Sequence, residues 1–274
     1  MEIISGPNVF NVNELVGISD RFRLYACTQK GVAGRRLLQI AATVEDNPLL
    51  QRSALHLKEL EGKAYELEEE FARVKEKPDD RLDYQLGIPE LIDSFECLEQ
   101  GRRLINILGF RNVEDISQVI PLANIAKKDK RRIDAKTSAW IMGKLLKLLV
   151  FSHSEGFTPD PLDANNILIE PVQHYVMIFN WARIDITAAK RREDISNAAK
   201  TVITAVGGNP RTGYLPDDGE ENFAQYREIL FRLASQEFTS AKKAHEAFYG
   251  VVYVIWPRTY HKFTTKPMNE GGKE

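Results

Sequence analysis

The stretch that decides the fold runs from His153 to Ile169 and reads HSEGFTPDPLDANNILI. A polar loop that is rich in proline and aspartate leads here into the apolar run Ile167–Ile169. A second apolar run, Tyr175–Phe179, follows after a short turn and ends in Asn180-Trp181-Ala182. The two apolar runs predict a β-hairpin, with a polar loop before it and a polar side chain directly after it.

The bulk properties indicate an ordinary soluble protein. The chain has 274 residues, enough to bury a core as one large domain or as two lobes. Its net charge of −2 creates no strong field toward nucleic acid or membrane. No basic segment followed by an apolar one opens the chain, and no segment is long enough to span a membrane. We therefore expect a cytoplasmic protein with neither a nucleic-acid nor a membrane partner.

Two further features set limits on function. The only cysteines, Cys27 and Cys97, lie far apart in apolar runs, so we expect two buried free thiols and no metal site. The basic runs 127–132 and 190–192 are short and have no interleaved aromatic residues. Such runs are typical of solvated loops, which argues against nucleic-acid binding.

The order of predicted elements indicates an α+β protein with two lobes. The first lobe, residues 10–110, contains strand-like runs and one long helix, 48–77, between Pro48 and Pro78. The expected strands are 10–16, 22–29, 36–43, 94–99 and 103–110. The second lobe, residues 111–266, is mainly helical and contains the hairpin described above. Its expected helices are 137–152, 193–206 and 221–249. We expect the polar tail 267–274 to be disordered.

The helix 48–77 carries a heptad stripe of apolar side chains. The stripe comprises Leu50, Leu57, Leu60, Ala64, Leu67, Phe71 and Val74. We favour packing of this stripe on the chain's own sheet, because a helix in this position has a sheet to cover. A homodimer through helix 48–77 is the alternative.

This order of elements resembles a protein kinase of the bacterial serine/threonine type, over residues 10–245. A kinase catalytic loop reads Asp-Leu-x-x-x-Asn, and a later strand ends in Asp-Phe-Gly. Leu162 and Asn166 keep the loop spacing. The catalytic aspartate falls on Pro161 and the metal-binding aspartate on Asn180. The resemblance therefore implies a two-lobed kinase-like fold in which the catalytic residues are replaced.

The remaining matches to the kinase pattern are single residues. Gly17 stands at the first glycine of the glycine-rich loop, Gln39 at the phosphate-binding lysine, and Ser53 at the glutamate that pairs with that lysine. Leu108, Gly109 and Phe110 form the expected hinge edge. His153 and Asp194 match structural positions around the catalytic loop. The segment 183–193 is far shorter than a usual activation segment.

These replacements remove charge from phosphoryl transfer, which depends on positioning and charge neutralisation. Gln39 carries no charge, Asn180 is a poor ligand for magnesium, and Pro161 has no titratable group. We therefore expect a catalytically inactive, pseudokinase-like protein that acts as a regulatory, scaffold or interaction module for a protein partner. Asp160 and Asp163 flank the missing base, and we expect them to be loop-capping or solvated carboxylates.

The alternative is an atypical nucleotide-dependent transferase or kinase, in which Asp160 or Asp163 and Asn166 form a divergent site. Weak ATP binding is left open. Neither magnesium nor another cofactor is expected. A nucleotide, if bound, should contact a set of residues around the cleft between the lobes. These are Gly17, Gln39, Leu108, Gly109, Phe110, Asn166 and Asn180.

Overall fold

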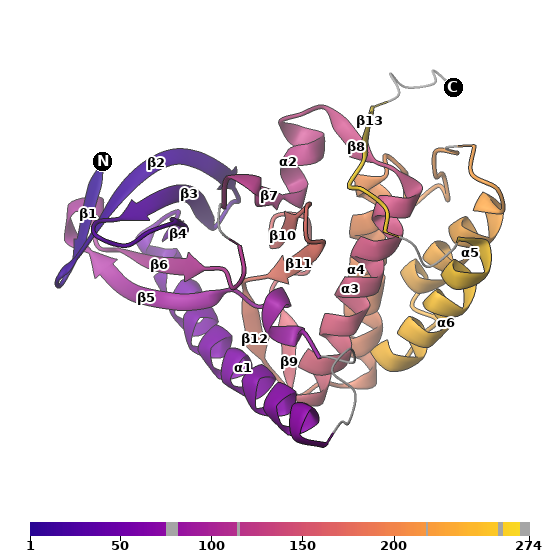
Figure 1. Cartoon of the computed structure of the whole chain (residues 1–274), viewed down its shortest axis with the longest axis horizontal. Coiled ribbons are helices and arrows are strands. Elements are labelled where there is room, and N and C mark those ends of the chain that lie inside the picture. Colours follow the sequence, from indigo (N-terminus) through magenta and orange to yellow (C-terminus); the bar gives the residue numbers. More distant parts are fainter. Residues whose placement is uncertain (75–81, 114–115, 218, 257–259, 269–274) are drawn as a thin grey trace.

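The chain folds into two lobes joined along one long helix (Figure 1). The computed structural model describes residues 1–74, 82–113, 116–217, 219–256 and 260–268. The first lobe is an antiparallel sheet with α1 (Asn47–Val74) against it, and the second lobe is mainly helical. None of the helices in these ranges is long and apolar enough to cross a membrane.

The sheet of the first lobe has, among the described residues, six strands in the order β1-β2-β3-β4-β6-β5. Their bounds are β1 Glu2–Ser5, β2 Asn8–Ile18, β3 Phe22–Gln29, β4 Arg35–Ala41, β5 Glu90–Cys97 and β6 Arg103–Gly109. β1 was not expected from the sequence. It pairs with β2 and places Ile3 in a small core with Phe10, Cys27 and Cys97. Both cysteines are free and buried, as predicted.

Alternation along β4 decides which side chain meets α1. Leu38 and Ile40 point into the small core inside the curled sheet, whereas Leu37 and Ala41 belong to the main core beneath it. Gln39 therefore points the same way as Leu37 and Ala41, toward α1 and the second lobe.

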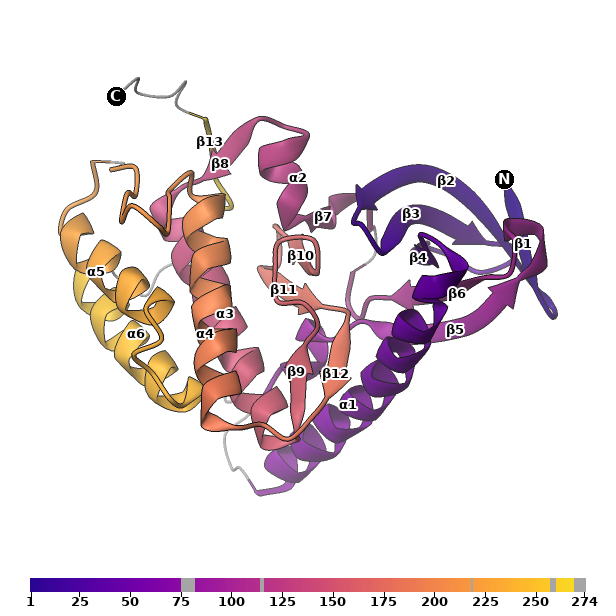
Figure 2. The ribbon, with the colours of Figure 1, turned by 180° about the vertical axis from the view of Figure 1, so that it is seen from behind.

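The first four residues of the heptad stripe of α1 pack within the chain, as favoured from the sequence, whereas Val74 at the end of the helix is 77% exposed. Leu50, Leu57, Leu60 and Ala64 are buried in the main core. Figure 2 shows α1 running down beside β12 (Trp181–Arg183) and β9 (Phe157–Pro159) of the second lobe. The predicted helix end at residue 77 lies outside the described residues.

The second lobe holds the predicted hairpin, β10 (Ile167–Glu170) with β11 (Tyr175–Ile178). A short strand, β7 (Ile120–Pro121), pairs with the other edge of β10 and leads into α2 (Leu122–Lys127). The other elements are β8 Arg131–Ile133, α3 Ala135–Ser154, α4 Ala188–Ala205, α5 Phe223–Ala234, α6 Ala241–Ile255 and β13 Thr265–Pro267. Short 3₁₀ turns lie at 44–46, 84–87, 98–100 and 116–118.

Three predictions for the C-terminal part of the chain were wrong. The expected single helix 221–249 is two helices, because Gln236 adopts a left-handed backbone conformation (φ 65°) that ends α5. The helix expected at 193–206 begins earlier, at Ala188, where the Thr187 side chain accepts a hydrogen bond from the Lys190 amide. Pro267, expected in a disordered tail, ends β13, which pairs with β8. Residues 269–274 lie outside the described ranges.

Candidate functional site

Gln39 lies at the centre of a buried network of neutral side chains. Only 1% of its surface is exposed, and its Nε2 donates a hydrogen bond to Oδ1 of Asn180 at 2.8 Å. Its Oε1 accepts a hydrogen bond from Nδ2 of Asn106 on β6, at 3.1 Å. Asn106 in turn donates to the carbonyl of Leu50 on α1. The position of the kinase lysine is thus occupied by an amide that is hydrogen-bonded at both ends.

Ser53 ties α1 to the same network. Its hydroxyl lies 3.2 Å from Oδ1 of Asn180 and 3.3 Å from the carbonyl oxygen of Phe179. The hydroxyl oxygen accepts a hydrogen bond from the Trp181 amide at 3.2 Å. The acidic position of the kinase pattern therefore holds a buried hydroxyl, and its contact with the Gln39 position runs through Asn180.

The side-chain amide of Asn166 is hydrogen-bonded to the backbone of the second lobe. Its Nδ2 donates to the carbonyls of Pro161 and Asn180, at 2.8 and 2.9 Å. Its Oδ1 accepts from the Asn180 amide at 2.8 Å. The side chain is fully buried. It fixes the loop 161–166 against the strand end at Asn180, and both amide hydrogens are used.

The two flanking carboxylates stand apart from this network. Asp160 is exposed. Oδ1 of Asp163 accepts hydrogen bonds from the amides of Asn165 and Asn166, at 2.7 and 3.3 Å. Asp163 therefore caps its own loop, as such residues do in turns. Pro161, between them, is also exposed.

Asp194 joins three elements below the loop. Its Oδ2 lies 2.9 Å from Nε2 of His153 at the end of α3 and accepts from Thr158 of β9 at 2.7 Å. Its Oδ1 pairs with Lys190, one turn earlier on α4, at 3.0 Å. Burial opposes the charge of Lys190, but Asp194 and Glu193 outweigh it and raise the pKa of the lysine. The geometry is that of a structural anchor.

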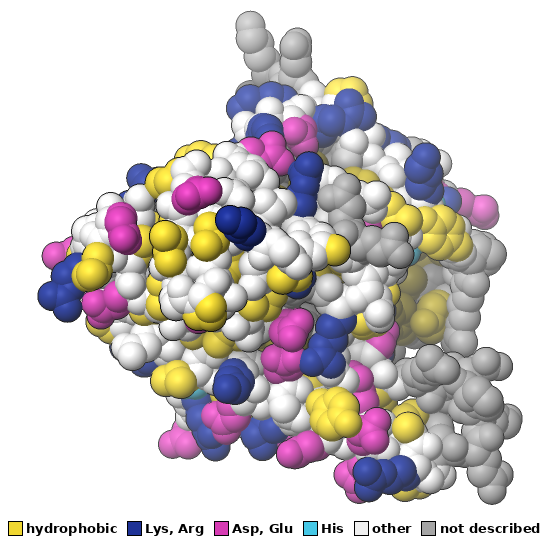
Figure 3. Space-filling model, turned by 60° about the vertical axis from the view of Figure 1, so that its left-hand side comes forward, with side chains coloured by type: hydrophobic (Ala, Val, Ile, Leu, Met, Phe, Trp, Pro, Cys, Tyr) yellow, Lys and Arg dark blue, Asp and Glu magenta, His cyan; other side chains and the backbone are white. Residues whose placement is uncertain are grey.

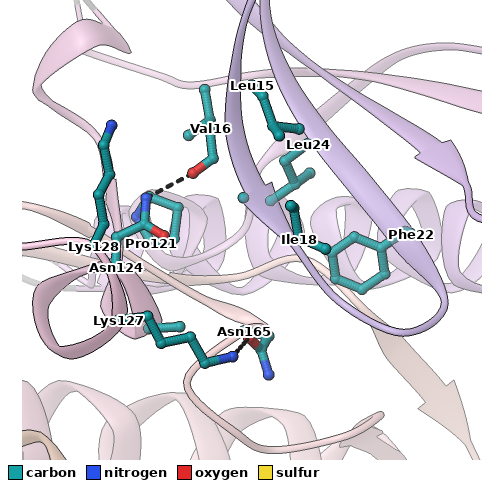
Figure 4. A pocket seen from close by; sticks show the side chains of 12 residues that line it. Leu15, Val16, Ile18, Phe22, Leu24, Pro121, Asn124, Lys127, Lys128 and Asn165 are labelled. Carbon is teal, nitrogen blue, oxygen red and sulfur yellow. Dashed lines mark hydrogen bonds between the residues drawn. The ribbon is translucent and has the colours of Figure 1, made fainter.

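Residues 15–18 of β2, which match the glycine-rich loop of the kinase pattern with Gly17 as their only glycine, are called the glycine-rich strand below. This strand is held close to the second lobe (Figure 4). Nδ2 of Asn124 on α2 donates to the carbonyl of Val16 at 2.6 Å. A Cβ added at Gly17 would lie 3.5 Å from the ring of Pro121, which is paired in register with Leu168 of β10. Pro121 therefore fills the space between the first-lobe strand above and the β10 strand below.

β2 and β3 form a hairpin, and Phe22 is the first residue of β3. Its side chain closes the inner part of the cleft. It is 4% exposed, and its ring packs edge-on against Phe179 with centroids 5.5 Å apart. A cavity of about 360 Å³ remains outside this contact, between the hairpin and α2. Its lining residues are Leu15, Val16, Gly17, Ile18, Phe22, Leu24, Pro121, Ala123, Asn124, Lys127, Lys128 and Asn165.

The predicted nucleotide-binding residues are brought together only in part. Gln39, Asn166 and Asn180 meet in the buried network, and Gly17 lines the open cavity. The hinge residues Leu108, Gly109 and Phe110 are buried and do not line that cavity. Within the described ranges, no group of three or more His, Cys, Asp or Glu side chains could hold a metal ion.

Sequence reasoning missed three residues of the site. Asn106 was visible as the one amide in the apolar strand 103–109, a signal that a buried partner is needed. Pro121 and Asn124 carry no such signal, because their contacts with the glycine-rich strand arise only when the two lobes come together.

Comparison with known proteins supports the fold. No protein-family model matches the chain, and no curated protein matches its sequence. The structure is similar to the PknI kinase domain of Mycobacterium tuberculosis, with a TM-score of 0.53 and 15% identity over 88% of this chain and 96% of that chain. A double mutant of the same domain gives a TM-score of 0.53 and 15% identity over 89% and 96%. The chain therefore has an α+β, two-lobed, protein-kinase-like fold.

Proposed function

We propose that the chain is a catalytically inactive kinase-like protein that works by binding a protein partner. The observation that carries the proposal is the buried hydrogen bond between Gln39 and Asn180. In active kinases these two positions supply the lysine that holds phosphate and the aspartate that holds magnesium. Here the two side chains satisfy each other, carry no charge, and are sealed from solvent.

The closed cleft supports the same reading. Phe22 and Pro121 occupy space beneath the glycine-rich strand, and Asn124 ties that strand to α2. A general base contributes about 10²–10⁴ in rate, and one preorganised electrostatic contact about 3–4 kcal/mol. These contributions do not add simply, but loss of all of them leaves little catalysis.

The two lobes are held in one arrangement by contacts along α1. Lys63 pairs with Glu155 at the end of α3 at 2.9 Å, and Nδ1 of His56 lies 3.0 Å from the carbonyl oxygen of Trp181. Glu59 forms an ion pair with Arg183 of β12. Such a body presents fixed surfaces, which suits a scaffold or regulatory module.

The proposed partner surface is the outward side of α1, with the mouth of the cleft as a second area. Leu55 is 64% exposed and Tyr65 is 53% exposed on this side of the helix. Figure 3 looks toward the first lobe and shows charged side chains of both signs gathered in its lower half, among scattered hydrophobic ones. Apolar anchors within a charged rim are typical of protein interfaces.

The test is transfer of radiolabelled phosphate from ATP with magnesium, to the protein itself and to generic substrates. The expected signal equals that of a triple variant, Asp160→Ala, Asp163→Ala, Asn166→Ala, whose fold is checked by circular dichroism. Incorporation above that background would favour a nucleotide-dependent transferase, with Asp160 or Asp163 as its base.

A further inference from the structure

The cavity between the β2–β3 hairpin and α2 has an apolar wall, and two lysines at the end of α2 line its rim (Figure 4). The Lys127 side chain reaches toward Asn165, and the Lys128 side chain extends away from it. Aliphatic side chains from both lobes form most of the wall, and the wall comprises Leu15, Val16, Ile18, Phe22, Leu24 and Pro121. A volume of about 360 Å³ lies within the range of small-molecule sites, about 300–1,000 Å³. A ligand with an apolar body fits this wall.

The edge of the cavity carries positive charge, and Lys128 also lines an adjoining pocket together with Glu14 and Asp129. Lys127 and Lys128 line the cavity itself, and no aspartate or glutamate does. Lys127 donates to the neutral Oδ1 of Asn165 at 3.1 Å. Among the described residues, the Lys128 side chain has neither a hydrogen bond nor an ion pair. Two lysines beside an apolar wall favour an anionic head group, and the absence of acidic ligands leaves no place for a metal ion.

The amides of the cavity are engaged only in part. Asn124 donates to the Val16 carbonyl, and Asn165 accepts from Lys127. Among the described residues, Oδ1 of Asn124 and Nδ2 of Asn165 have no hydrogen-bond partner, so both can meet polar groups of a ligand.

We propose that this cavity binds a small organic anion with an aliphatic body, such as a medium-chain carboxylate, without a metal ion. The site is separate from the Gln39–Asn180 network, since neither residue lines the cavity. The proposal does not depend on catalytic inactivity, because the cavity offers the same groups whether or not phosphate is transferred elsewhere.

The test uses sodium decanoate as the probe and decanol as its uncharged match, each below its aggregation threshold, in calorimetric titrations of the full chain. Decanoate should bind more tightly than decanol. The double variant Lys127→Met, Lys128→Met should bind decanoate about three- to tenfold more weakly and decanol unchanged. Lys200→Met, an exposed lysine on α4, is the matched control and should bind like the parent protein. Equal binding of decanoate and decanol, or an unchanged double variant, would overturn the proposal.

A second pair of variants tests the location. Ile18→Glu places a carboxylate at the cavity, where 57% of the isoleucine is exposed, so folding should be preserved. Ile4→Glu is its control, because Ile4 is 58% exposed on the same sheet but does not line the cavity. Decanoate binding should fall only in Ile18→Glu. An equal fall in both variants would identify detergent-like binding and refute the site.

Discussion

Nε2 of Gln39 on β4 lies 2.8 Å from Oδ1 of Asn180, 141 residues later in the chain. This single bond joins the sheet of the first lobe to the strand end of the second. It stands where the kinase pattern brings a lysine and an aspartate together around phosphate and metal. Because both groups are neutral and buried, the bond joins the two lobes, and these two side chains carry no charge.

Restoring one charge alone should destabilise the protein. Gln39→Lys buries an ammonium group beside neutral amides, and we expect the free energy of unfolding to fall by about 3–5 kcal/mol. Adding Asn180→Asp supplies a partner and should recover part of the loss, with a coupling of about 0.5–3 kcal/mol in a double-mutant cycle measured by urea unfolding. Gln51→Lys, at an exposed position of α1, is the control and should change stability by less than about 0.5 kcal/mol. If Gln39→Lys left the free energy of unfolding unchanged, the network would not be sealed from solvent.

The clamp between α2 and the glycine-rich strand should be visible in hydrogen exchange. Asn124→Ala removes the bond to the Val16 carbonyl, worth about 0.5–1.5 kcal/mol. Amides of residues 15–18 should then exchange about two- to twelvefold faster, measured by mass spectrometry. Asn165→Ala alters the same cavity without a bond to this strand and should leave these amides unchanged. Equal exchange in the parent and Asn124→Ala would mean that the strand is held by packing alone.

Stability should fall at alkaline pH because of Cys27. Burial is the main cause that raises the pKa of this thiol to about 12, and Arg36 opposes it in part. The folded state keeps the proton and the unfolded state loses it from about pH 9, so stability is complete below that pH and declines as pH rises toward 12. The slope should be about 1.4 kcal/mol per pH unit for this group. Cys27→Ala should flatten the curve between pH 9 and 10.5 in urea unfolding. An identical slope in the variant would contradict burial of the thiol.

The outward side of α1 should carry the partner. The double variant Leu55→Glu, Tyr65→Glu should reduce recovery of bound proteins from the native host at least tenfold, with no change in melting midpoint, because both side chains are exposed. Ile4→Glu, equally exposed on β1, serves as the control. Every partner staying bound to the double variant, and also to charge reversals at the cleft mouth, would rule out both surfaces.

Much of the fold followed from local patterns in the sequence. The apolar runs of β3 and β4 and the heptads of α1 reflect burial, so they predict these elements, and the spacing between Leu162 and Asn166 contributed through the resemblance to the kinase pattern. The candidate residues Gln39, Ser53, Asn166 and Asn180 were singled out through the resemblance to the kinase pattern. What spacing could not show is how Gln39, Ser53 and Asn180 are joined, since their bonds link segments more than 120 residues apart.

The missed features depend on contacts between distant elements. β1 is four residues long and gains its place only by pairing with β2. The break between α5 and α6 depends on the left-handed backbone conformation of Gln236. A glutamine in the sequence does not predict that conformation, as a glycine would. In the sequence Pro121 has the character of an ordinary turn residue, and its contact with the glycine-rich strand appears only in the folded chain.

The most direct test of an emptied cleft is the melting midpoint of the chain with 1 mM ATP, with and without magnesium. A competent site with a Kd near 10 μM should raise the midpoint by about 5–10 °C, since binding at a hundredfold excess adds about 2.7 kcal/mol and each kcal/mol is worth roughly 2–4 °C. The neutral, sealed pair Gln39–Asn180 predicts no magnesium-dependent shift. A rise of several degrees that requires magnesium would contradict it and favour a nucleotide-dependent enzyme.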